Sequence, residues 1–156
     1  MNATERSVIH HTFSIERTYP VSPERVFQAF ADPAIKARWF VSPEGWTTTE
    51  STMDFRVGGR ETNIGSPPDG MVIAYDARYM DIVANQHIVF THEILMDGKR
   101  LSVSVATIEL MPEGSGTRFI HTEQGAYLDG LDTGEQREEG TLELMKLLEA
   151  VIAEMD

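Results

Sequence analysis

The sequence predicts an α+β fold in which a curved antiparallel sheet wraps around one long C-terminal helix. The helix is indicated by residues 134–156, where apolar side chains recur every three or four positions and form a single stripe. The sheet is indicated by alternating segments before it, separated by glycine, proline and aspartate turns. A strongly bent sheet cannot close fully on a straight helix ~30 Å long, so we expect an apolar cavity between the two.

The first element is a strand. Phe13, Ile15 and Tyr19 alternate with polar residues, and this period of two is typical of a strand with one buried face. Residues 1–9 lie outside the pattern, so we expect them to form a loose tail.

Two short helices follow. Ser22 and Asp32 each precede a proline. The serine and aspartate side chains can cap the free amides of a helix, and proline is suited to the first helical turn. The first helix has an apolar side that includes Phe27 and Phe30. The second is predicted to continue through residues 35–40.

Strand patterns then fill the chain up to the long helix. Turn residues between them favour antiparallel neighbours, and we expect about six strands in this part of the chain. The five segments with a readable pattern are Ser51–Val57, Met71–Tyr79, His87–Leu95, Arg100–Leu110 and Thr117–Thr122.

The register of one hairpin can be predicted as well. A two-residue turn at residues 97–98 sets His92 opposite Val103 on a dry face and places the serines of the hairpin on a wet face. In this register Ile108 and Leu110 point outward, unless a β-bulge shifts the phase.

Composition excludes several classes of function. The formal net charge of −12 opposes binding to phosphate backbones and anionic membranes, so neither nucleic acid nor membrane is an expected partner. The chain has no cysteine, which removes disulfides and thiolate chemistry. No signal peptide and no stretch of ~20 apolar residues is present, which favours a cytoplasmic location.

The order and spacing of short motifs resemble the helix-grip proteins (START/Bet v 1-like fold) of the START-like (SRPBCC) superfamily. Within it the chain is similar to the AHSA1-like family, related to the C-terminal domain of the activator of Hsp90 ATPase. The likeness predicts one domain over residues 1–156. It rests on residues 22–27, 32–33, 38–40, 54–59, 68–70, 82–89 and 116–117 and on Gly140.

This resemblance implies a cavity between the sheet and the long helix, which various members use for lipids, hormones or polyketide intermediates. It brings no catalytic motif to this chain. One departure is Glu61, which stands where family members usually carry an aromatic residue.

The candidate ligand-binding residues are aromatic, imidazole and thioether side chains expected to face the helix. They are Trp39, Phe55, Tyr75, Tyr79, Phe90, His92, Phe119, His121, Tyr127 and Met145. A strand between His92 and His121 separates their backbones by ~9 to 10 Å, so we predict neither a metal site nor a cofactor. Glu123 is expected to bond backbone amides where the chain leaves the sheet.

Three functions remain open. The preferred one is binding of a small apolar molecule, without catalysis. The second is a cyclase or lyase that uses the same cavity, with His92, His121 or Glu123 transferring a proton. The third is a chaperone-regulating interaction domain, which an exposed apolar patch around Ile108 and Leu110 would favour. The sequence leaves a homodimer open.

Overall fold

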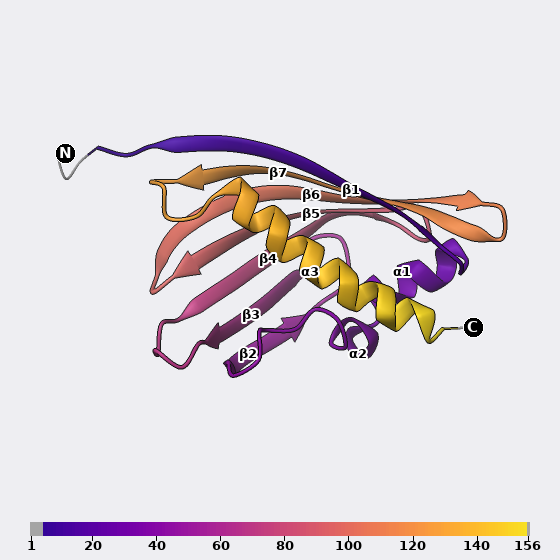
Figure 1. Ribbon diagram of the computed structural model, residues 1–156, viewed down its shortest axis with the longest axis horizontal. Coiled ribbons are helices and arrows are strands. Elements are labelled where there is room, and N and C mark those ends of the chain that lie inside the picture. Colours follow the sequence, from indigo (N-terminus) through magenta and orange to yellow (C-terminus); the bar gives the residue numbers. More distant parts are fainter. Residues whose placement is uncertain (1–4, 156) are drawn as a thin grey trace.

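The computed structural model describes residues 5–155, and within them one seven-stranded antiparallel sheet curves around the long helix (Figure 1). The sheet order is β1-β7-β6-β5-β4-β3-β2. The elements are β1 (Val8–Tyr19), α1 (Pro23–Ala31), α2 (Pro33–Lys36), β2 (Thr47–Met53), β3 (Arg60–Ser66), β4 (Ile73–Val83), β5 (His87–Met96), β6 (Lys99–Glu113), β7 (Gly116–Leu128) and α3 (Gly134–Ala153). This architecture confirms the predicted α+β helix-grip fold.

The first strand is longer than the sequence indicates. β1 begins at Val8 and pairs with the far end of β7, where Val8 lies opposite Leu128 and Ile9 opposite Tyr127. The predicted loose tail is therefore wrong at these two residues, because backbone pairing holds them although their side chains are exposed. Residues 1–4 of that tail lie outside the described residues.

Both helix starts are confirmed by their caps. The Ser22 side chain accepts a hydrogen bond from the Arg25 amide, and the Asp32 carboxylate accepts one from the Ala34 amide. The second helix is shorter than predicted: α2 ends at Lys36 and turns follow, rather than helix through residue 40.

The chain has the six strands expected between the short helices and the long helix, but the sequence pattern did not locate one of them. β3 carries charged and polar side chains on both faces at its start, so no period of two marks it. Its partner β2 spans Thr47–Met53, whereas the predicted strand covered Ser51–Val57.

The glycine pair between β2 and β3 makes a tight turn. Gly58 has a φ of +83°, and its amide donates to the Tyr79 carbonyl oxygen at 2.8 Å. A Cβ on Gly59 would lie 2.0 Å from the carbonyl oxygen of Asp54. Gly59 therefore lets two backbone segments approach closely.

We expect Gly59→Ala to lower the free energy of unfolding by ~2 kcal/mol or more, since the backbone itself must move to admit a methyl group. Gly140→Ala is the matched control. A Cβ there meets nothing within 4 Å inside α3, so alanine should stabilise the protein by ~1 kcal/mol. Urea denaturation measures both, and equal stabilities for Gly59→Ala and the wild type would contradict the prediction.

A β-bulge changes the register of the β5–β6 hairpin. The pairing shifts between Ile94 and Leu95, so His92 lies opposite Ser104. The predicted pairing of His92 with Val103 is wrong by one residue, and a one-residue slip exchanges the two faces of a strand. Val103 is accordingly 44% exposed, while Ser104 is buried.

The same bulge turns the second half of β6 inward. Ile108 is 0% exposed and Leu110 is buried, and both belong to the hydrophobic core. The apolar surface patch expected around these two residues is therefore absent. These two residues therefore provide no exposed patch that would favour an interaction domain.

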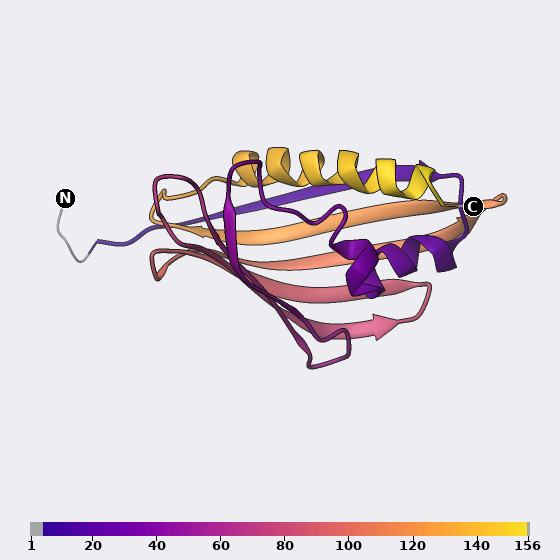
Figure 2. The same cartoon turned by 90° about the horizontal axis from the view of Figure 1, so that it is seen from below.

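The long helix lies along the concave side of the sheet (Figure 2). Thr133 caps its start by accepting a hydrogen bond from the Gln136 amide. Its buried stripe confirms the sequence pattern and includes Met145, Leu148 and Ile152. α3 packs against β1 and α1. Between residues 5 and 155, no helix combines the length and the apolar character needed to cross a bilayer.

Candidate functional site

A cavity of about 730 Å³ lies between α3 and the sheet, away from the side where α3 packs on β1. Its walls come from the end of α1, from α2 and the loop after it, from β4, β5 and β7, and from α3 between Gln136 and Leu147. Val41 and Leu147 line it and are exposed, so the cavity opens to solvent between the loop and the helix.

Six predicted site residues line this cavity, and four do not. Those that line it are Trp39, Tyr75, Phe90, His92, His121 and Met145. Those that lie elsewhere are Phe55, Tyr79, Phe119 and Tyr127.

The four others are occupied in packing. Phe119 is 0% exposed and stacks on Phe30 in the core. Phe55 and Tyr79 pack edge to face, with ring centroids 4.9 Å apart. Tyr127 is buried beneath the guanidinium of Arg137. An alternating pattern assigns a face but does not separate the part of that face that packs from the part that borders a cavity.

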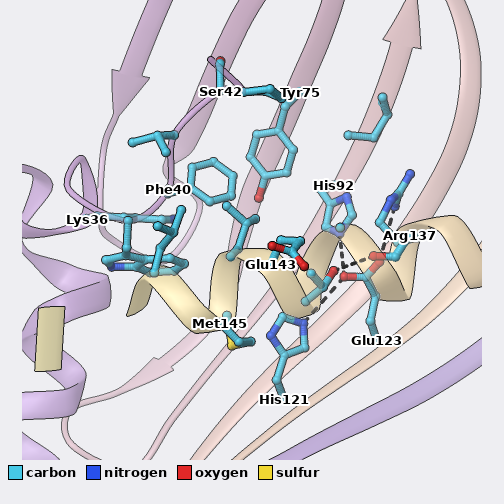
Figure 3. A pocket seen from close by; sticks show the side chains of 18 of the residues that line it. Lys36, Phe40, Ser42, Tyr75, His92, His121, Glu123, Arg137, Glu143 and Met145 are labelled. Atoms are coloured by element: carbon cyan, nitrogen blue, oxygen red, sulfur yellow. Dashed lines mark hydrogen bonds and ion pairs between the residues drawn. The ribbon is translucent and has the colours of Figure 1, made fainter. Parts of the chain in front are cut away.

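A polar cluster of His92, His121, Glu123 and Arg137 forms one end of the cavity (Figure 3). The Nε2 atoms of His92 and His121 lie 3.3 and 3.6 Å from Oε1 of Glu123. Nη1 of Arg137 donates to Oε2 of the same carboxylate at 3.3 Å. Although β6 separates the two histidine strands, the imidazoles converge on Glu123, which was expected to bond backbone amides.

Arg137 already donates three hydrogen bonds inside this part of the protein, to Glu123, Ser102 and Asp132. Its Nη2 donates to Ser102 at 2.7 Å and to Asp132 at 3.0 Å, and its guanidinium lies 5.4 Å from the Tyr127 ring centroid. The sequence analysis did not select Arg137. The available signal was that it is one of two basic residues in the acidic stretch 129–156.

Glu123 is held in its anionic form. Burial on its own raises the pKa of this carboxyl, but the neighbouring imidazoles of His121 and His92 and the guanidinium of Arg137 outweigh that effect. The net pKa lies well below the usual 4.5. A carboxylate with so low a proton affinity is a poor general base.

The histidines have unmet hydrogen-bonding capacity. His121 is 7% exposed, and neither of its ring nitrogens has a hydrogen-bond partner. Nδ1 of His92, which is 6% exposed, also lacks one. Buried polar atoms are nearly always satisfied, so these nitrogens leave hydrogen-bonding capacity at the cavity wall.

The opposite end of the cavity is aromatic, with one buried ion pair behind it. Figure 3 shows Phe40 and Lys36 on the side away from the polar cluster. Nζ of Lys36 donates to Glu61 at 2.6 Å, and Tyr79 also donates to Glu61. Burial lowers the pKa of Lys36, although the Glu61 carboxylate opposes that shift. Lys36 also lines a second cavity of about 330 Å³.

Across the part of the chain that the structure describes, no group of three or more histidine, aspartate or glutamate side chains is placed to hold a metal ion. The carboxylate of Glu123 instead balances the guanidinium of Arg137. The cluster is therefore arranged for hydrogen bonding and charge balance.

Comparison with known proteins gives a family and a set of similar structures. Residues 20–153 match the family described as activator of Hsp90 ATPase homolog 1-like protein. A search of curated proteins finds no match. The crystal structure of the Mll3558 protein from Rhizobium loti is 49% identical, with a TM-score of 0.86 over 93% of this chain and 99% of that one.

Two further structures extend the comparison. A putative uncharacterized protein from Rhizobium leguminosarum is 37% identical, with a TM-score of 0.90 over 96% of this chain and 99% of its own. The AHSA1-like protein from Aeromonas hydrophila is 22% identical, with a TM-score of 0.66 over 92% of each chain, and this likeness concerns the fold alone.

Proposed function

Because this chain belongs to the family of activator of Hsp90 ATPase homolog 1-like proteins and contains a cavity of about 730 Å³, we propose that it binds a small, mainly apolar molecule between α3 and the sheet. The observation that carries the proposal is the set of unpartnered histidine nitrogens in the cavity wall. A bound molecule would supply the missing hydrogen bonds and occupy the apolar volume beside them.

The wall chemistry supports a ligand with a large apolar part. Phe40 packs against Trp39 and Tyr75, and Phe90 lies next to His92, so aromatic rings border much of the volume. A cavity of this size falls in the range of small-molecule sites, ~300 to 1,000 Å³.

A blocking substitution at Gly140 tests the proposal. Gly140 lies on the helix face that lines the cavity, between Arg137 and Leu144, and has open space beside it. Gly140→Leu should stabilise the protein by ~0.5 to 1 kcal/mol, because leucine favours a helix over glycine, and its side chain should fill part of the cavity. Binding of the uncharged fluorophore N-phenyl-1-naphthylamine should fall at least roughly tenfold, since the volume available to it shrinks.

Gly140→Ala is the matched control and should retain most of the binding. Fluorescence titration of the three proteins, with urea denaturation to compare stabilities, gives the result. Equal fluorophore affinity in the wild type, Gly140→Ala and Gly140→Leu would contradict a binding site in this cavity.

A second candidate is an enzyme of cyclase or lyase type that uses the same volume. The favouring observation is the Glu123 carboxylate 3.3 Å from Nε2 of His92, because a carboxylate in this position stabilises an imidazolium formed by proton transfer. The proton-transfer groups would be His92 and His121, since Glu123 has a lowered pKa. Native mass spectrometry of a bound molecule, before and after incubation, separates the two roles: an unchanged mass supports binding alone.

A further inference from the structure

Both basic side chains at the cavity wall are paired with acidic ones. Of the basic side chains, Arg137 contacts both Glu123 and Asp132, and Lys36 contacts Glu61. The charged residues that line the cavity are Lys36, Glu44, Glu123, Asp132, Arg137 and Glu143. Among these residues four are acidic and two are basic, and both basic groups have an acidic partner.

The arrangement of these charges decides which polar group of a ligand can lie at the end of the cavity formed by the polar cluster. A ligand carboxylate placed against His121 would lie near the Glu123 carboxylate, and Arg137 is already shared between two acids and Ser102. An ammonium group would have no direct access to Glu123, because His92, His121 and Arg137 already surround that carboxylate. A carboxylate would therefore leave water to meet an excess of acidic groups, and an ammonium would leave water without contacting Glu123, which is 4% exposed.

An uncharged hydroxyl fits the same position. A neutral imidazole has one donor and one acceptor nitrogen, and both nitrogens of His121 lack a hydrogen-bond partner. A hydroxyl can donate to one nitrogen or accept from the other, and it carries no charge that must be compensated. The His121 ring is held in place by stacking on Phe13, with ring centroids 6.2 Å apart.

We propose that the ligand is an uncharged apolar molecule with a hydroxyl or phenol group, which hydrogen-bonds to His121 at the end of the cavity formed by the polar cluster. This inference rests on the proposed binding function and adds the class of molecule. It also predicts that carboxylates and amines with the same apolar body are rejected.

Four probes with one ring system test it: naphthalene, 2-naphthol, 2-naphthoate and 2-naphthylmethylamine, titrated at pH 7.5. We expect 2-naphthol to bind roughly two- to tenfold more tightly than naphthalene, the advantage of a net hydrogen bond. The two charged probes should bind at least about tenfold more weakly than 2-naphthol, because their charge is not compensated.

Variants locate the contact. His121→Phe keeps a ring stacked on Phe13 and removes both nitrogens, so 2-naphthol should fall to the affinity of naphthalene while naphthalene itself is little changed. His10→Phe is the control, since His10 is exposed on β1 and does not line the cavity. Comparison of the four probes on the wild type does not depend on either variant folding.

The outcomes separate this inference from the function on which it rests. If none of the four probes binds the wild type, the binding function fails and the inference fails with it. If naphthalene binds but 2-naphthoate or 2-naphthylmethylamine equals 2-naphthol, the cavity stands and the uncharged class is wrong. Naphthoate binding that strengthens from pH 8 to pH 6 would likewise overturn it, because protonated histidines would then be receiving an anion.

Discussion

Replacement of Arg137 by methionine should lower the free energy of unfolding by roughly 3 to 5 kcal/mol, the cost of leaving a buried charge without its partner. The Glu123 carboxylate is 4% exposed, and Arg137 is its guanidinium partner as well as that of Asp132. Methionine retains most of the apolar stem of arginine, so the decrease in the free energy of unfolding measures the effect of removing the charge. Urea denaturation at pH 7 measures it.

Two further variants isolate the pair. The double variant Arg137→Met with Glu123→Gln should lose less stability than the sum of the single variants, since both charges are then absent. Arg100→Met is the surface control, because the Arg100–Glu93 pair is largely exposed and should contribute ~1 kcal/mol or less. If Arg137→Met lost no more unfolding free energy than Arg100→Met, the charge of Arg137 would not stabilise the cluster.

The pH dependence of stability follows from the lowered pKa of Glu123. Its carboxyl has a folded-state pKa below the usual 4.5, so its contribution is fully present above about pH 4.5 and is lost as the pH falls through the folded-state pKa. The groups that face it are His92, His121 and Arg137. The stability difference between the wild type and Glu123→Gln should therefore narrow from pH 7 to pH 3.

Thermal or urea unfolding over this pH range, with both proteins in the same buffers, gives that difference directly. A difference that widens at acid pH would mean that Glu123 binds its proton more tightly in the folded protein than in the unfolded chain.

Lys36→Met should cost a similar amount, roughly 3 to 5 kcal/mol, because it leaves Glu61 buried and without its cation. Glu61 is 2% exposed, and Lys36 is 7% exposed. Tyr79 still donates to Glu61 in this variant, but a phenol does not neutralise a carboxylate. Urea denaturation at pH 7 again measures the loss.

The matched control is Lys146→Met. Lys146 forms an ion pair with Glu143 on the exposed side of α3, and both side chains are 72% exposed, so little stability should be lost. The double variant Lys36→Met with Glu61→Leu should recover most of the loss, since an apolar pair in place of a buried ion pair is often neutral. If Lys36→Met and Lys146→Met proved equally stable, Lys36 would not be buried as the structure places it.

Much of the fold could be predicted because its signals are local. The caps at Ser22 and Asp32 and the stripe of α3 depend on residues within one or two helical turns. β3 was not predicted, because its pairing with β2 and β4 decides which face of the sheet each of its polar residues occupies. The site was predicted in part: the inward faces of β5 and β7 select His92 and His121, but Arg137, which pairs with the Glu123 carboxylate between them, comes from α3.

The amino-acid sequence by itself determined the order of elements, the helix starts and the long apolar stripe, since each depends on neighbours within a few residues. The tertiary structure alone decided the bulge that faces Ile108 inward, the burial of Glu61 beside Lys36, and the meeting of two histidines and Arg137 at Glu123. The physical reason is distance along the chain. Register, charge pairing and the unfilled volume depend on how far strands and helix stand apart, and that separation is fixed only when the whole sheet closes on α3.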